Sequence, residues 1–263
     1  MKNDEAYKNM DYIPDGAAYP ARWAAAASAF RDGLGTKATL GISYGKRERN
    51  WFDLFLPDAA PEGVMIFVHG GYWLRFGPRD FSHLAAGALA RGWAVAMPAY
   101  TLAPEARIGE MVQEIAAAVT EIAAKVAGPI LLAGHSAGGH LVARMACEGV
   151  LPEDVAERLA CVMPISPVSD LGPLMQTSMN EDLKIDAMEA MDESPSYGLN
   201  IEGLPVHVWV GADERPVFLD QARWLAEAWG VELTVEKGRH HFDVIEGLEQ
   251  ADSPMMRALF GDD

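Results

Sequence analysis

Residues 129–149, PILLAGHSAGGHLVARMACEG, set a short apolar run before a glycine-rich turn and a helical pattern after it. The turn itself, GHSAG at residues 134–138, is a G-x-S-x-G. Three fixed positions recur easily by chance, so the flanking strand and helix patterns decide the interpretation. We interpret the stretch as a sharp strand–turn–helix elbow that exposes the hydroxyl group of Ser136.

The same alternation continues along the chain. Short apolar runs begin at residues 64, 93, 129, 161, 206 and 231, and helical patterns occupy residues 20–31, 79–91, 108–126, 137–148 and 215–229. Unbroken apolar strands that alternate with helices indicate a mostly parallel sheet with both faces covered. Residues 39–57 add an antiparallel hairpin. The pattern predicts about eight strands in one α/β domain spanning residues 1–263.

Residues 166–200 fit this alternation least well. They are rich in Met, Pro and Asp, and they are long for a connection between a strand and a helix. Long connections are usually functional or mobile. We expect a small cap-like insertion here, a loop with a short helix that roofs the site.

The composition excludes several classes of function. The formal net charge is −17, which repels phosphates and argues against nucleic acids and anionic membrane surfaces. The start of the chain lacks the pattern of a signal peptide, and no apolar run approaches the roughly 20 residues of a membrane span. The two cysteines, Cys147 and Cys161, have no zinc-ligand spacing and are typical of reduced thiols. We therefore expect a cytoplasmic protein without a metal or an organic cofactor.

A serine on such an elbow needs a base, and in this type of fold the base follows in the chain. His140 lies four residues along the same helix, and His207 lies inside an apolar strand. The loop GRHHFDV, after the last predicted strand, is the glycine-punctuated segment that could reach the site. We predict His241 rather than His240 as the base, because His241 precedes an apolar phenylalanine that could anchor it.

The acid that orients the base should follow the apolar run beginning at residue 206. The turn there reads Gly211-Ala212-Asp213-Glu214. Aspartate is the commoner orienting acid, which favours Asp213, whereas a position three residues after the glycine favours Glu214. Asp170 is a weaker third candidate that is more typical of a turn. We predict Glu214 and keep Asp213 as the alternative.

Attack on a carbonyl group builds an oxyanion, which needs preorganised donors. The amide of Ala137, just after the serine, can be one donor. The other should come from the loop that follows the run beginning at residue 64, where the sequence reads HGGYW. Gly70 and Gly71 let backbone amides approach an oxyanion without an intervening side chain.

The motifs HGGYW and GHSAGG, in this order, resemble those of the α/β-hydrolase fold, in its esterase and lipase branch. HGGYW is also similar to the HGGxW motif of the kynurenine formamidases (arylformamidases) and their bacterial esterase-like relatives. The likeness extends to YPARW, DERPVF and HHFDV. It implies Ser136 as nucleophile and His241 as base. It places the acid at Glu214, where the family commonly has Asp.

The resulting hypothesis is a serine hydrolase that cleaves a small ester or amide, with N-formylkynurenine as the substrate that the resemblance suggests. Tyr72 and Trp73 are candidates for an aromatic wall of the substrate pocket, as are Tyr100 and Tyr197. One alternative is a broad-specificity carboxylesterase or thioesterase, and a remote one is a non-catalytic hydrolase-fold binding protein. The expected partner is a small molecule, and a homodimer is compatible with the sequence.

Overall fold

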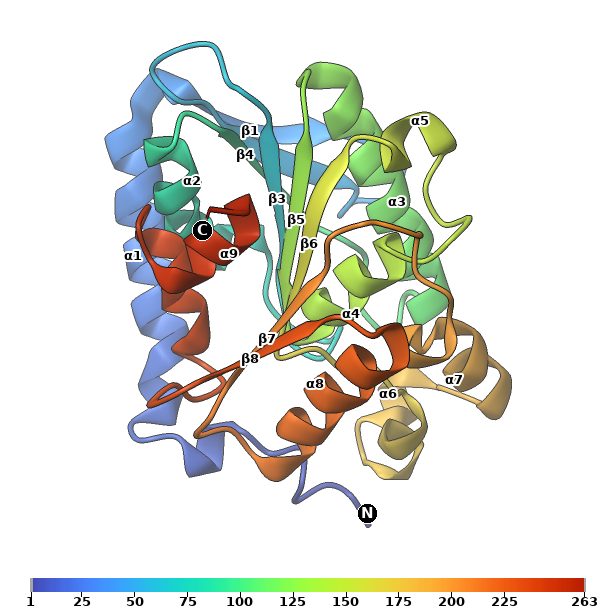
Figure 1. The fold of residues 1–263 in the computed structure, drawn as a ribbon. Coiled ribbons are helices and arrows are strands. Elements are labelled where there is room, and N and C mark those ends of the chain that lie inside the picture. The colour runs from blue at the N-terminus through green and yellow to red at the C-terminus, as the bar shows by residue number, and fades with distance from the viewer. Residues whose placement is uncertain (1, 263) are drawn as a thin grey trace.

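The computed structural model describes residues 2–262 and is built around one eight-stranded sheet (Figure 1). The strand order across the sheet is β1-β2-β4-β3-β5-β6-β7-β8. The strands are β1 Ala38–Ser43, β2 Trp51–Phe55, β3 Val64–Val68, β4 Ala94–Pro98, β5 Ile130–His135, β6 Leu159–Ile165, β7 His207–Gly211 and β8 Glu232–Glu236.

Most of the sheet is parallel, as the sequence predicts. Strands β4, β3, β5, β6, β7 and β8 pair in parallel, while β1 pairs with β2 and β2 with β4 in antiparallel fashion. The antiparallel hairpin therefore extends one edge of a parallel sheet. All five residues of β3 are buried, in keeping with a strand covered on both faces.

Helices cover both faces of the sheet (Figure 1). Alternate residues of β3 face opposite ways: Ile66 belongs to the core that includes α3, and Phe67 belongs to the core that includes α1. No helix within residues 2–262 has the length and apolar character needed to cross a bilayer. The α-helices are α1 Tyr19–Leu34, α2 Ala86–Ala90, α3 Ile108–Lys125, α4 Ala137–Met145, α5 Glu153–Ala156, α6 Asn180–Leu183, α7 Ala187–Glu193, α8 Pro216–Trp229 and α9 Pro254–Phe260.

The predicted helix at residues 79–91 is instead two 3-10 turns, Pro78–Asp80 and Ser82–Ala85, followed by the short α2. Phe81 interrupts the helix because its backbone leaves the helical region, with φ of −126° and ψ of 10°. Its ring is buried and packs against Trp23 at 5.2 Å. Core packing of one aromatic ring therefore overrides the local helical pattern.

The segment at residues 166–200 contains more helix than the sequence predicts. It forms the 3-10 turns Gly172–Gln176 and Pro195–Tyr197 as well as α6 and α7. Asp186 caps the N-terminus of α7, because its side chain accepts hydrogen bonds from the amides of Met188 and Glu189. This cap stabilises a helix that is too short to show a clear hydrophobic period.

The elbow between β5 and α4 brings three backbone segments into direct contact. A methyl group added at Gly138 would lie 2.0 Å from the carbonyl oxygen of Val68 at the end of β3. One added at Gly134 would lie 2.2 Å from the carbonyl oxygen of Gly138. Only glycine allows α4 to pack this closely against β3 and β5.

We predict that Gly138→Ala lowers the free energy of unfolding by about 3 kcal/mol, the upper end of the range for overpacking, because the methyl group overlaps the backbone and not a movable side chain. Gly33→Ala is the matched control, because no atom lies within 4 Å of its added methyl group. Near the end of α1 it should be neutral or stabilising by up to about 1 kcal/mol. Urea denaturation of both variants checks the difference, and equal effects would contradict it.

Candidate active site

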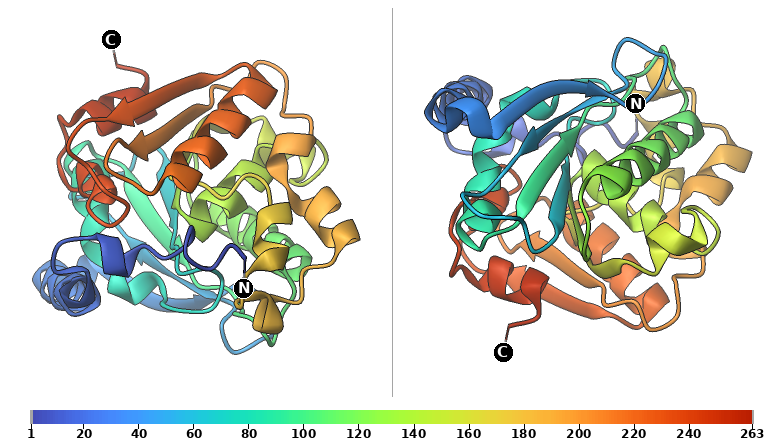
Figure 2. Two further views of the ribbon diagram at one scale, coloured as in Figure 1. Left: turned by 90° about the horizontal axis from the view of Figure 1, so that it is seen from below. Right: turned by 90° about the horizontal axis from the view of Figure 1, so that it is seen from above.

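The candidate catalytic residues lie at the edge of the sheet where the parallel strands end. Gly70 follows β3, Ser136 follows β5, Ser166 follows β6, Glu214 follows β7 and His241 follows β8. Loops at the carboxyl ends of parallel strands converge there. Figure 2 (left) views the molecule from below, and the N-terminal segment, in dark blue, crosses the sheet from this side.

Ser136 occupies a strained turn. Its φ of 56° and ψ of −115° are uncommon for a residue with a side chain. The surrounding backbone holds this conformation, because the Ser136 amide donates to the carbonyl of Ile165 at 2.8 Å and the His140 amide donates to the carbonyl of Ser136 at 3.0 Å. The hydroxyl group is thereby placed at the start of α4, in the geometry that the motif predicts.

Glu214, and not Asp213, bonds to His241. The Nδ1 of His241 and the Oε2 of Glu214 are 2.6 Å apart. The other carboxylate oxygen accepts from the Ser166 hydroxyl at 2.5 Å and from the Gly211 amide at 2.9 Å. Glu214 is 7% exposed and Asp213 is exposed. The turn decides between the two acids, because the hydrogen bond from the Gly211 amide holds the Glu214 carboxylate on the buried side, while Asp213 stays exposed.

Ser166 is the member of this group that the sequence did not reveal. It directly follows β6 and has a φ of 47°, so its strained backbone turns the hydroxyl toward the buried carboxylate. The sequence drew attention to Asp170 in the same loop. That residue accepts from the Gly172 amide and the Tyr197 hydroxyl, so it stabilises a turn.

The ring of His241 is held from two further directions. His135 places its Nε2 at 2.8 Å from the His241 carbonyl, and the two rings lie 4.7 Å apart. Burial, with a smaller effect from His241, lowers the pKa of His135 well below its ordinary value, so His135 is a neutral donor. Phe218 packs at 4.1 Å on the His241 ring. By contrast, His240 bonds to Tyr19 and does not line the cavity described below.

The HGG loop is braced by a buried histidine. Burial lowers the pKa of His69 to about 3, and its ring stacks on Tyr100 at 4.5 Å. No backbone amide of Gly70, Gly71 or Ala137 donates a hydrogen bond to another residue in the range 2–262. Amides without a partner next to Ser136 suit the binding of an oxyanion.

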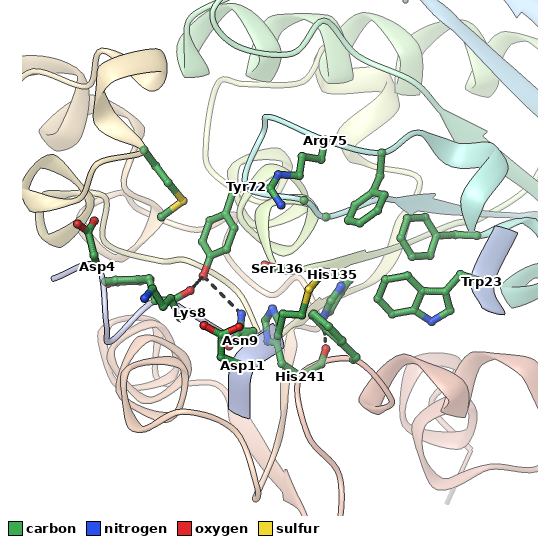
Figure 3. Close-up of a pocket in the computed structure, with 18 of the residues that line it drawn as sticks. Asp4, Lys8, Asn9, Asp11, Trp23, Tyr72, Arg75, His135, Ser136 and His241 are labelled. Atoms are coloured by element: carbon green, nitrogen blue, oxygen red, sulfur yellow. Dashed lines mark hydrogen bonds between the residues drawn. The ribbon is translucent and has the colours of Figure 1, made fainter. Parts of the chain in front are cut away.

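A cavity of about 370 Å³ opens onto Ser136 and His241 (Figure 3). Trp23 forms one side, with its ring against those of Phe76, Phe81 and Phe242 at 5.2–6.0 Å. Trp23 lies in YPARW, a stretch whose local pattern predicts a helix and not a place in the site. The complete lining is Asp4, Tyr7, Lys8, Asn9, Met10, Asp11, Trp23, Gly70, Gly71, Tyr72, Arg75, Phe76, Phe81, His135, Ser136, Ser178, Met179, His241 and Phe242.

Of the predicted aromatic wall, only Tyr72 lines this cavity. The prediction of Trp73 as a pocket residue is wrong: its ring is fully buried and meets His140 edge-on at 5.1 Å. Both residues have positive φ, which folds the loop tightly and sends neighbouring rings to different surroundings. Tyr100 is buried behind the loop and Tyr197 is exposed on the surface.

No group of three metal-binding side chains occurs among the described residues. The side chain within hydrogen-bonding distance of the His241 ring is the Glu214 carboxylate. A model of the alpha/beta hydrolase fold matches residues 65–242, which include the HGG loop, the elbow and His241. The chain belongs to the α/β-hydrolase family.

Relatives of this hydrolase include formamidases and esterases. It is 27% identical to a kynurenine formamidase from Danio rerio, over 81% of this chain and 78% of that protein. A crystal structure from Silicibacter sp. TM1040, provisionally described as a thioesterase, has a TM-score of 0.97 and 53% identity, with 99% of both chains covered. An esterase from Pyrobaculum calidifontis has a TM-score of 0.69 at 18% identity, covering 98% of this chain and 95% of that chain, and so shares the fold.

The N-terminal segment of the hydrolase, residues 4–11, forms more of the cavity wall than the insertion does. Only Ser178 and Met179 of residues 166–200 line the cavity. The N-terminal segment is held by Tyr72, whose hydroxyl donates to the Tyr7 carbonyl at 2.6 Å and accepts from Asn9 at 3.4 Å. The expected roof over the site is therefore supplied mostly by the start of the chain.

We predict that Tyr72→Phe loosens the N-terminal segment, because it removes hydrogen bonds worth about 1 kcal/mol each. Hydrogen exchange should accelerate at residues 3–9, while the global unfolding transition changes little. Tyr197→Phe is the control, since that hydroxyl bonds to Asp170 outside the cavity lining. Unchanged exchange at residues 3–9 would show that Tyr72 does not hold the segment.

Proposed function

We propose that this hydrolase cleaves a small ester or amide by nucleophilic catalysis, with Ser136 as nucleophile, His241 as base and Glu214 as the orienting acid. The observation that carries the proposal is the buried 2.6 Å contact between Glu214 and His241, beside a cavity that His241 and Ser136 both line. A carboxylate on Nδ1 leaves Nε2 as the nitrogen that accepts a proton.

In the proposed reaction, Nε2 of His241 takes the proton from Ser136 as Oγ attacks the substrate carbonyl. Glu214 stabilises the positive charge that forms on the ring. The tetrahedral intermediate collapses when His241 gives that proton to the leaving amine or alcohol. Water, activated by the same histidine, then attacks the acyl group on Ser136 and releases the acid.

The oxyanion of each intermediate would be held by the amide of Ala137 and by that of Gly70 or Gly71. Ala137 begins α4, whose N-terminal end favours negative charge. Gly70 is in close contact with the elbow, since a methyl group added there would lie 3.1 Å from Cβ of Ser136. This closeness supports a donor role for the HGG loop, because it places the loop beside the nucleophile on the elbow.

An aryl formamide such as N-formylkynurenine is the substrate class that we propose. Support comes from the relatives that are kynurenine formamidases and from the aromatic side of the cavity around Trp23. A formyl group is the smallest acyl group, and an aromatic leaving group would pack on the rings of this wall.

A broader carboxylesterase or thioesterase is the second candidate. It is favoured by the Silicibacter relative, which is 53% identical and is provisionally described as a thioesterase. The same nucleophile and oxyanion donors serve esters, thioesters and amides, so the two proposals differ only in what the cavity selects.

The catalytic assignment predicts stoichiometric labelling of the wild-type protein by a serine-directed phosphonate, and no labelling of Ser136→Ala. Turnover should fall by at least about 10⁴-fold in Ser136→Ala. Glu214→Gln should lose about 10²- to 10⁴-fold, because the altered side chain favours the wrong tautomer of His241.

Asp213→Asn is the matched control for the acid, since it removes the neighbouring charge on an exposed side chain. It should retain most of the activity. An unlabelled wild-type protein would overturn the hydrolase proposal, and a greater loss in Asp213→Asn than in Glu214→Gln would overturn the choice of acid.

The substrate proposal predicts that kcat/KM is higher for N-formylkynurenine than for nitrophenyl acetate or a short acyl thioester. All three are measured with the wild-type protein, and Ser136→Ala controls for background hydrolysis. A clear preference for the thioester would instead establish the second candidate.

A further inference from the structure

Arg75 differs from the other arginines of the chain. Within residues 2–262, its guanidinium group forms no hydrogen bond, ion pair or ring contact, whereas every other arginine has at least one of these. Arg75 nevertheless lines the same cavity as Ser136. Its side chain reaches over the cavity beside Tyr72 (Figure 3).

The loop that carries Arg75 is rigidly built. Tyr72, Trp73 and Phe76 have φ values of 55°, 58° and 70°, which are uncommon for residues with side chains. The Arg75 amide donates to the Gly71 carbonyl at 3.1 Å. Strained backbone that is held on several sides is typical of ligand-binding loops.

A second arginine fixes this loop from outside. Arg49 donates to the Phe76 carbonyl at 2.8 Å and to the Tyr100 carbonyl at 2.7 Å. The backbone on the far side of Trp73 is also held, because the Ala103 amide donates to the Trp73 carbonyl at 2.8 Å. The backbone position of Arg75 relative to Ser136 is therefore set by the fold, while its exposed guanidinium group has no partner within residues 2–262.

A cation at this point contrasts with the molecule as a whole, whose formal net charge is −17. Lys8, which also lines the cavity, already pairs with Glu5 at 3.3 Å. Asp4 and Asp11 also line the cavity from the N-terminal segment, and Asp4 accepts from the Ser178 amide. These carboxylates repel an anionic ligand. The positive charge of Arg75 would offset that repulsion and so favour entry of an anion.

We propose that Arg75 binds a carboxylate group on the substrate, while the aromatic side of the cavity around Trp23 takes the aryl group. The proposal rests on the proposed function and adds to it the residue that selects aryl amides or esters carrying a carboxylate. The planar guanidinium fork matches a carboxylate with two parallel hydrogen bonds, which gives direction as well as attraction. Bound at both ends, the substrate places its reacting carbonyl between Arg75 and Trp23, beside Ser136.

The test separates binding from catalysis. Benzoylpropionate carries an aryl group and a carboxylate, and benzoylpropionamide is its neutral counterpart of nearly equal shape. Calorimetry gives the dissociation constant of each for the wild-type protein, Arg75→Met and Arg75→Lys. Arg223→Met is the control, because Arg223 is exposed on α8 and pairs with Asp220, outside the cavity lining.

The wild-type protein should bind the carboxylate more tightly than the amide. Arg75→Met should weaken carboxylate binding by about 10- to 100-fold, the range for a hydrogen-bonded charged pair, and should leave amide binding nearly unchanged. Arg75→Lys should recover part of the loss, because it keeps the charge without the fork. Arg223→Met should behave as the wild type does.

Equal binding of the two compounds by the wild type, or equal weakening of both by Arg75→Met, would overturn the role of Arg75. Phosphonate labelling of Ser136 is measured on the same preparations. A labelled protein that fails the binding test refutes only this inference. An unlabelled protein refutes the proposed function whatever the binding result.

Discussion

The structure depends on backbone-to-backbone contact at the elbow between β5 and α4. The contact requires glycine at positions 134 and 138, where an added methyl group would overlap carbonyl oxygens at 2.2 and 2.0 Å. It brings the first turn of α4 against the end of β3, and so sets Ser136 beside the loop that contains Gly70. Strain at Ser136 persists because this packing and its backbone hydrogen bonds leave the residue no other conformation.

The second constraint is the burial of a carboxylate. Glu214 is 7% exposed, and burying such a group without partners is costly. Its two oxygens are satisfied by His241 from the loop after β8, by Ser166 from the loop after β6 and by the amide of Gly211, the last residue of β7. The same bonds fix the orientation of the imidazole ring. The contacts that stabilise the buried carboxylate therefore also position the ring of His241.

The carboxyl ends of the parallel strands bring together the chemically different sides of the cavity. Trp23 comes from α1 and Arg75 from the loop after β3, while the N-terminal segment closes the remaining side. These segments are distant in sequence and meet only because the parallel strands end together. Their chemistry differs, with aromatic rings on one side of Ser136 and charged residues on the other. The cavity therefore favours one orientation of a bound molecule that has an apolar end and a charged end.

The sequence by itself determined all eight strands, helices α1, α3, α4 and α8, and the elbow, because hydrophobic period and glycine placement act over a few neighbouring residues. It also indicated Ser136, His241 and the HGG loop through short motifs. Only the tertiary structure decided that Glu214 and not Asp213 meets His241, that Trp73 faces the core, that Phe81 breaks a predicted helix and that residues 4–11 wall the cavity. Each of these outcomes depends on where a side chain points and on partners far away in the chain. A local pattern carries no information about such contacts until the strands have been brought together.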